Sequence, residues 1–173
     1  MFYLRPEEVK EFLDRIENKR DRLMYELFLT SGMRCFELQK QNREDILGKR
    51  SFKIIGKGQV EREIFLPEDL VQKIQEFCGR KRTGPLFLSN RGKRISLQTI
   101  KYLSKKYLRQ IGIDKKGFGT HSLRHSALTE IYRQTKDLRL TQEIAGHSSP
   151  DITQIYTHIF PEQKMVAVES MWK

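Results

Sequence analysis

The chain has 173 residues, enough for one domain with a sizeable core, and its 38% hydrophobic and 10% aromatic content excludes a disordered protein. Lysine and arginine number 33 against 22 aspartates and glutamates, and the resulting net charge of +11 favours a polyanionic partner, with nucleic acid the first candidate. No apolar run approaches the length of a membrane-spanning helix, and the N-terminus lacks a signal-peptide core, so we expect a cytoplasmic protein that does not engage a membrane.

The first 40 residues predict three helices. Pro6, followed by two glutamates, is typical of a first helical turn, where proline loses no hydrogen bond and acids complement the helix dipole. Apolar residues at helical spacing extend this helix over residues 6–16. A second helix is predicted for residues 20–31, ending at Gly32, and a short third one near Cys35–Lys40.

The pattern then changes to the alternation of β-strands. Ser51–Ile55 and residues 60–66 are rich in β-branched and aromatic side chains, and they flank the tetrapeptide Gly56-Lys57-Gly58-Gln59. A glycine turn between two such runs predicts a β-hairpin. We expect residues 46–47 to add a third strand, which gives a small antiparallel sheet near the N-terminal third.

The rest of the chain is predicted to be mainly helical. Pro67 opens a helix that reaches about Cys78, and residues 84–95 form a loop that could include a short strand at 86–88. Further helices are predicted for residues 100–108, 121–133 and 138–145, for a segment that begins at Ser149-Pro150 and carries Tyr156, and for residues 161–172. The fold class is therefore mainly α with a small antiparallel β-sheet.

The two cysteines, Cys35 and Cys78, lie far apart and outside any CxxC pattern. We predict neither a disulfide framework nor a zinc site, and we expect both to be small buried side chains.

Four local patterns combine cationic, imidazole and phenol side chains. They are Arg34 in SGMRCFEL, Lys57 in the hairpin GKG, His121, Arg124 and His125 in HSLRH, and His147 with Tyr156 in GHSSPDITQIYTH. Taken singly, each has an ordinary structural explanation: a solvated or helix-capping arginine, an exposed turn lysine, a polar helix surface, and a core aromatic on an apolar helix stripe.

Taken together, these residues supply what a metal-free phosphodiester transfer needs. The forks of Arg34 and Arg124 can hold the equatorial oxygens of a pentavalent phosphate. A tyrosine oxygen can form a covalent intermediate, a histidine can accept its proton, and a lysine at a flexible tip can protonate the leaving oxygen. No cluster of acidic residues suggests a magnesium site, so the cations of the protein itself would neutralise the charge.

In this order the residues resemble the tyrosine recombinase (phage integrase) family, which includes the Xer proteins, lambda integrase and Cre. The family pattern is an arginine, a hairpin lysine, His-x-x-Arg, a histidine or tryptophan, and a tyrosine. The resemblance covers about residues 5–160, with no departure at a catalytic position. It implies the catalytic-domain fold of that family.

The resemblance implies a nucleophile and two proton-transfer residues. Tyr156 would attack the scissile phosphate, form a 3′-phosphotyrosine and release a 5′-hydroxyl. Lys57 would protonate the leaving oxygen, and His121 would act as the base or orient the tyrosine.

The resemblance also implies the residues that hold the phosphate. Arg34 and Arg124 would clamp it, and His147 would hydrogen-bond to it. Glu37, three residues after the first arginine, would support that arginine, although a solvent-facing glutamate is an equal alternative. No metal or other cofactor would be required, because the phosphotyrosine retains the bond energy.

The partner implied is double-stranded DNA at the nucleoid, with strand exchange through a Holliday junction in a tetramer that is weakly associated or monomeric without DNA. Relatives carry an N-terminal core-binding (SAM-like) domain; we expect it to be absent, with residues 1–173 forming one catalytic domain. An exposed apolar set in the last helix would dock on a neighbouring protomer or on its own domain: Val166, Val168, Met171 and Trp172.

Three alternatives differ in class. A type IB topoisomerase shares the chemistry, but the HSLRH and GHSS wording favours a recombinase. A DNA-binding relative without activity would be expected to have lost at least one member of the set. An unrelated RNA-binding domain offers no reason for the order of the six residues.

Overall fold

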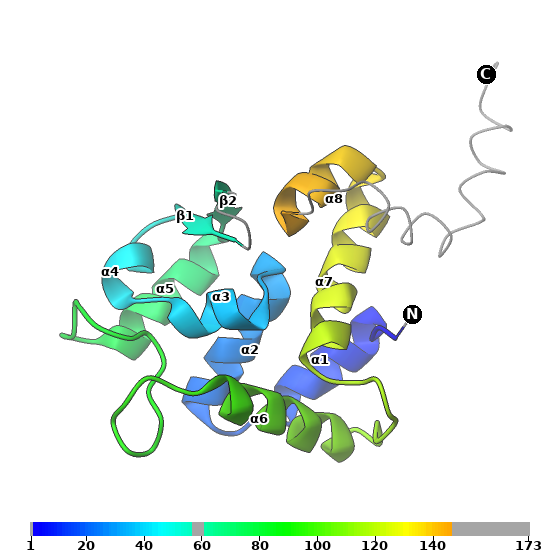
Figure 1. The fold of residues 1–173 in the computed structure, drawn as a ribbon, viewed down its shortest axis with the longest axis horizontal. Helices are drawn as coiled ribbons and strands as arrows, with labels where there is room; N and C mark the ends of the chain where they lie inside the picture. Colours follow the sequence, from blue (N-terminus) through cyan, green and yellow to red (C-terminus); the bar gives the residue numbers. More distant parts are fainter. Residues whose placement is uncertain (1, 57–60, 147–173) are drawn as a thin grey trace, which may run out of the picture.

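A computed structural model describes residues 2–56 and 61–146, and Figure 1 shows their arrangement. In chain order the elements are α1 (Pro6–Asp14), α2 (Lys19–Ser31), α3 (Cys35–Lys40), α4 (Arg43–Ile46), β1 (Ser51–Ile55), β2 (Glu61–Phe65), α5 (Glu68–Cys78), α6 (Leu97–Gln110), α7 (Thr120–Thr135) and α8 (Leu138–Ala145). The prediction of a mainly helical domain with a small antiparallel sheet is confirmed.

Local sequence signals fix the ends of several helices. The Asn18 side chain accepts a hydrogen bond from the Asp21 backbone N–H at the start of α2, and Ser96 does the same for Thr99 at the start of α6. Helix α2 ends, as predicted, at Gly32, whose φ of 59° is the left-handed conformation that a helix-terminating glycine adopts at little cost.

The hairpin pairs β1 with β2 in antiparallel register, from Ser51 opposite Phe65 to Ile55 opposite Glu61. The expected third strand at residues 46–47 is wrong, because Ile46 is the last residue of α4 and the described sheet has two strands. Nor do residues 86–88 form a strand: Leu88 makes only an isolated bridge to Arg94.

The core forms where α2 packs against α1, α5 and α7, with α6 contacting α1, α3 and α7. Helices α1 and α2 contribute several of its largest fully buried side chains: Phe12, Met24, Tyr25, Leu27 and Phe28. A smaller apolar cluster of Leu128, Tyr132 and Ala145 joins α7 to α8. Burying these surfaces is the main driving force for docking α8, which thereby comes to lie between α7 and the hairpin.

The prediction for the two cysteines has a mixed outcome. Both cysteines are free thiols, but Cys78 is buried whereas Cys35 is half-buried. The predicted helices at residues 149–160 and 161–172 lie outside the described residues. Within the described part of the chain, no helix has the length and apolar character needed to cross a membrane.

Candidate active site

Arg34 is positioned by the turn between α2 and α3. After α2 ends at Gly32, the chain extends and Arg34 becomes the residue that precedes the first turn of α3. Its side chain is 25% exposed and donates from Nη1 to Oε1 of Glu37 at 3.2 Å and from Nη2 to the carbonyl oxygen of Gly146 at 3.0 Å. A local turn thus connects Arg34 to the distant end of α8.

His121 and Arg124 lie in the first turns of α7 and share one face of the helix. Arg124 is buried, and it donates from Nη1 to the carbonyl oxygen of Gly32 and from Nη2 to that of Ala145 at 2.7 Å. His121 is exposed. Because the N-terminal end of a helix attracts anions, this part of α7 favours a bound phosphate.

A pocket of about 440 Å³ collects these residues. Its lining comes from α2, α3, α6 and α7, and comprises Phe28, Arg34, Cys35, Phe36, Leu97, Lys101, Thr120, His121, Arg124 and His125. The structure therefore brings three of the predicted site residues, Arg34, His121 and Arg124, together in one pocket. Lys57, His147 and Tyr156 lie outside the described residues.

Glu37 is buried, so the solvent-facing alternative is wrong. Oε1 accepts from Nη1 of Arg34 at 3.2 Å and from Nη1 of Arg62 at 2.8 Å. Oε2 accepts from the Arg34 backbone N–H and from Nη2 of Arg62, both at 2.6 Å. Burial alone would raise the pKa of Glu37, but the hydrogen bonds and charges of Arg62 and Arg34 outweigh it and lower the pKa below its ordinary value.

His125 follows Arg124 in the pocket lining and is half-buried. Burial lowers the pKa of its imidazole, and the positive charges of Arg124 and His121 lower it further. The ring is therefore neutral at pH 7. The guanidinium groups of Arg34 and Arg124, which line the same pocket, make it suited to an anion.

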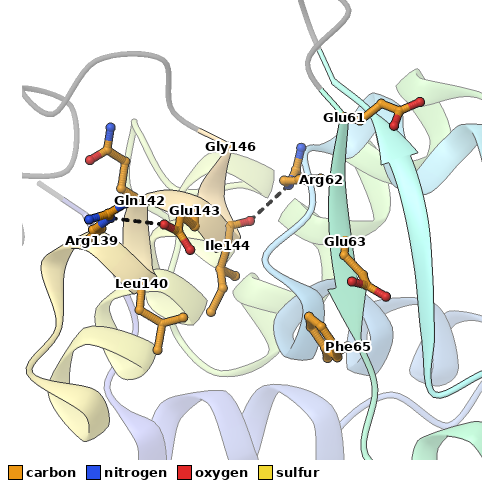
Figure 2. A pocket seen from close by; sticks show the side chains of 10 residues that line it. All are labelled: Glu61, Arg62, Glu63, Phe65, Arg139, Leu140, Gln142, Glu143, Ile144 and Gly146. Atoms are coloured by element: carbon orange, nitrogen blue, oxygen red, sulfur yellow. Dashed lines mark hydrogen bonds and ion pairs between the residues drawn. The ribbon is translucent and has the colours of Figure 1, made fainter.

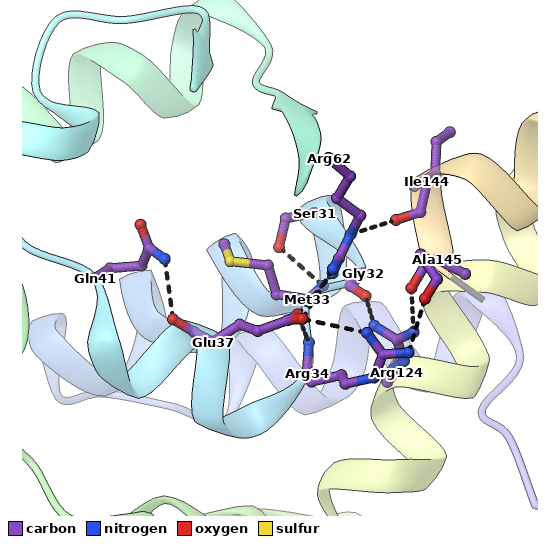
Figure 3. A network of polar contacts seen from close by, with 11 residues as sticks. Ser31, Gly32, Met33, Arg34, Glu37, Gln41, Arg62, Arg124, Ile144 and Ala145 are labelled. Atoms are coloured by element: carbon purple, nitrogen blue, oxygen red, sulfur yellow. Dashed lines mark hydrogen bonds and ion pairs between the residues drawn. The ribbon is translucent and has the colours of Figure 1, made fainter. Parts of the chain in front are cut away.

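Arg62, on β2, is the residue that the sequence analysis missed. Besides its two bonds to Glu37, its Nε donates to the carbonyl oxygen of Ile144 at 3.0 Å (Figure 3). One signal could have found it: Arg62 occupies an inward position of an alternating strand, beside Ile64, and a buried charge at such a position requires a partner.

The arrangement is suited to holding a tetrahedral or pentavalent oxyanion. Arg34 and Arg124 present planar forks with fixed donor geometry, and His121 adds a group that can transfer a proton. Over residues 2–56 and 61–146, no three His, Cys, Asp or Glu side chains gather in a cluster that could hold a metal ion.

Comparison with known proteins agrees with this geometry. The sequence profile of the phage integrase family matches residues 3–163. Tyrosine recombinase XerC of Caldanaerobacter subterraneus subsp. tengcongensis is 39% identical over 176 residues, covering 96% of this chain and 50% of that protein. The chain spans about half the length of the curated relatives it matches.

Solved structures show the same fold. The XerH site-specific recombinase in its pre-cleavage complex with difH substrate has a TM-score of 0.79 and 27% identity, covering 100% of this chain and 55% of that one. The catalytic domain of bacteriophage HP1 integrase has a TM-score of 0.75 and 20% identity, covering 98% and 95%. With a profile match over most of its length and this fold, the chain belongs to the phage integrase family of tyrosine recombinases.

Proposed function

We propose that this chain is the catalytic domain of a site-specific DNA recombinase that cuts and rejoins double-stranded DNA through a phosphotyrosine at Tyr156. One observation carries the proposal: Arg34 and Arg124, far apart in the sequence, line a single pocket with His121. That grouping is what a phosphodiester needs, because two arginine forks can hold its non-bridging oxygens while charge develops on them.

The comparisons support DNA as the partner. XerH was solved with a difH substrate, and XerC is named a tyrosine recombinase. The net charge of +11 adds a sequence-independent attraction to the DNA backbone. A protein of this kind acts on DNA at the nucleoid, in the cytoplasm.

The proposed reaction is a transesterification in two reversible steps. In the first, the phenolic oxygen of Tyr156 bonds to phosphorus while the bond from phosphorus to the 5′ oxygen breaks. The phenolic proton passes to His121, and the leaving oxygen takes a proton from Lys57. In the second step a 5′-hydroxyl attacks the phosphotyrosine, its proton passes to Lys57, and the bond from phosphorus to the Tyr156 oxygen breaks as that oxygen regains its proton from His121. The diester is thereby restored, so bond energy is conserved without ATP.

The remaining site residues hold the phosphate. Arg34 and Arg124 bind the non-bridging oxygens, Glu37 supports Arg34, and His147 hydrogen-bonds to the phosphate. Exchange of both strand pairs requires four active sites and a Holliday junction, so we propose a tetramer on DNA that is weakly associated or monomeric without it.

A nicked suicide duplex tests this function. Because the target sequence is unknown, the duplex carries randomised bases on both sides of the nick, so that cleavage releases a short fragment and traps the enzyme on DNA. We expect wild type to form a covalent adduct that survives denaturation and Tyr156→Phe to form none. Sequencing the trapped DNA would then give a defined substrate.

Two outcomes of the suicide-duplex test would contradict different parts of the proposal. An adduct with the Phe variant would move the nucleophile to another residue. No adduct with wild type, over the whole random pool, would contradict the cleavage function itself.

A further inference from the structure

Arg62 is buried, and a buried guanidinium group requires hydrogen-bond acceptors for its nitrogens. It is 8% exposed, and all three of its guanidinium nitrogens donate to protein oxygens, two to the Glu37 carboxylate and one to the carbonyl of Ile144. A bidentate pair fixes both distance and orientation, unlike a point charge. Arg62 therefore holds Glu37 in one geometry.

These contacts connect three elements. Arg62 belongs to β2, Glu37 to α3, and Ile144 to the last turn of α8. Figure 2 shows the bond from Arg62 to Ile144 beside a pocket of about 570 Å³ whose lining includes Phe65 of β2 and Leu140 of α8. The polar bond therefore links β2 to α8 directly, at the edge of this pocket.

The end of α8 is held by three arginines in succession. The carbonyl oxygen of Ile144 accepts from Arg62 at 3.0 Å, and that of Ala145 accepts from Arg124 at 2.7 Å. The next carbonyl, of Gly146, accepts from Arg34 at 3.0 Å. Carbonyls at a helix C-terminus carry partial negative charge, which favours this arrangement.

The three arginines differ in what a bound phosphate would demand of them. Arg34 and Arg124 line the pocket and must direct donors towards phosphate oxygens, whereas Arg62 does not line it. The bonds of Arg62 can stay unchanged while the other two adjust. It is the fixed member of the group.

We propose that Arg62 is a positioning residue of the phosphate site. It fixes the Glu37 carboxylate that orients Arg34 and, through the same guanidinium, the end of α8 on which Arg34 and Arg124 meet. The distance between the two phosphate-holding arginines is thereby set before DNA binds, and small errors in such placement reduce rates strongly. The inference rests on the proposed function.

A purely structural role of Arg62 predicts a different effect of its replacement on cleavage. If Arg62 only stabilises the fold, its replacement lowers the folded fraction, and cleavage falls only in proportion. A positioning residue instead lowers the cleavage rate of the folded, DNA-saturated protein.

The test compares Arg62→Lys with Arg43→Lys. Arg43 is a matched control because it is 7% exposed, donates from Nη1 to the carbonyl oxygen of Thr83 at 2.8 Å, and lies in α4 outside the pocket. The rate of adduct formation is measured in single turnover, with a saturating concentration of the duplex recovered from the random pool. All proteins are compared at one temperature, at which each variant is fully folded. DNA affinity is measured in a Tyr156→Phe background.

We expect Arg62→Lys to cleave slower by about tenfold or more, the scale of a misplaced catalytic group, with unchanged DNA affinity. Lysine keeps the charge but cannot hold both carboxylate oxygens and Ile144 at once. Arg43→Lys should cleave at the wild-type rate. Equal cleavage rates for the two variants would overturn the proposal.

A second measurement needs neither cleavage nor a target sequence. The nitrogen–proton NMR signal of the Arg34 Nε–H group reports its orientation, with inorganic phosphate as the probe of the pocket. We expect Arg62→Lys and Arg62→Gln to shift this signal and weaken phosphate binding, while Arg43→Lys does neither. If wild type forms no adduct, the proposed function fails, but the NMR measurement still tests the role of Arg62. An unchanged Arg34 signal together with an unchanged phosphate affinity would overturn that role.

Discussion

Arg34 and Arg124 approach the end of α8 from different elements and donate to neighbouring carbonyl oxygens, those of Gly146 and Ala145. Neither guanidinium therefore stands alone in solvent: the backbone already holds each one at the pocket. This shared anchor fixes the relative position of the two forks, so each should contribute through its geometry as well as its charge.

Replacing either arginine with lysine retains the charge and removes the fork. We expect Arg34→Lys and Arg124→Lys each to slow adduct formation by about 10²–10³-fold, the scale for losing one donor to a developing oxyanion. Single-turnover cleavage of the suicide duplex measures this. Arg133→Lys is the control, since Arg133 is exposed and pairs with Glu130 on its own helix at 2.7 Å. A variant that cleaves at the wild-type rate would remove that arginine from the site.

Glu37→Gln should destabilise the fold by about 3–5 kcal/mol at pH 7, because it breaks a buried ion pair and leaves Arg62 without a charged partner. The pKa of Glu37 is lowered in the folded protein, so its contribution is present above the unfolded value of about 4.3 and disappears as the pH falls through the lower folded value. Urea unfolding at decreasing pH should therefore bring wild type and variant together.

Glu68→Gln provides the control for this pH series. Glu68 is exposed and pairs with Arg50 at 3.5 Å, so its replacement should change stability by less than about 1 kcal/mol at any pH. A stability difference between wild type and Glu37→Gln that stays constant down to strongly acidic pH would show that ionisation of Glu37 does not contribute.

Gly146→Ala tests the fit between the end of α8 and Arg62. Gly146 has φ 61°, and a Cβ there would lie 2.8 Å from Cδ of Arg62, which its bonds to Glu37 hold in place. Gly112, with φ 76° and nothing within 4 Å of a Cβ, isolates the backbone cost. We expect Gly112→Ala to lose about 1–2 kcal/mol, and Gly146→Ala to lose more and cleave slower. Equal losses of unfolding free energy would argue against close packing on Arg62.

The titration of His125 should report anion binding in the pocket. Its pKa is lowered by burial and by the charges of Arg124 and His121, so the stability it contributes is complete above about pH 6.5 and is lost as the pH falls through the lowered value. A bound anion favours the charged imidazole, so inorganic phosphate should raise this pKa. NMR titration of the ring measures it, with Arg124→Gln as the variant in which phosphate has less effect. An unchanged pKa at saturating phosphate would place the anion elsewhere.

The sequence predicted most of the helices because their signals are local. Gly32 ends α2 as expected, and the alternation of residues 61–65 predicted β2. The third strand failed for an equally local reason: residues 43–46 form a short turn of helix, and a two-residue apolar run cannot distinguish helix from strand.

The site was predictable only in part. Arg34, His121 and Arg124 were predicted as site residues from their order along the chain, and one pocket brings them together. The role of Arg62 in holding Glu37 was not predictable from the sequence. The two residues pair between β2 and α3 through a tertiary contact that no local pattern encodes. The contacts to the carbonyl oxygens of α8 could not be predicted either, because every residue type carries a backbone carbonyl.

The three arginines that meet at α8 come from the α2–α3 turn, from β2 and from α7. Their meeting point exists only once all of these segments and α8 have docked. A newly made or partly unfolded chain therefore lacks the pocket in which Arg34 and Arg124 lie together, whatever its charge. If the chain cleaves DNA as proposed, this activity therefore appears only after the last of these segments has docked, and a partly folded chain would not nick DNA.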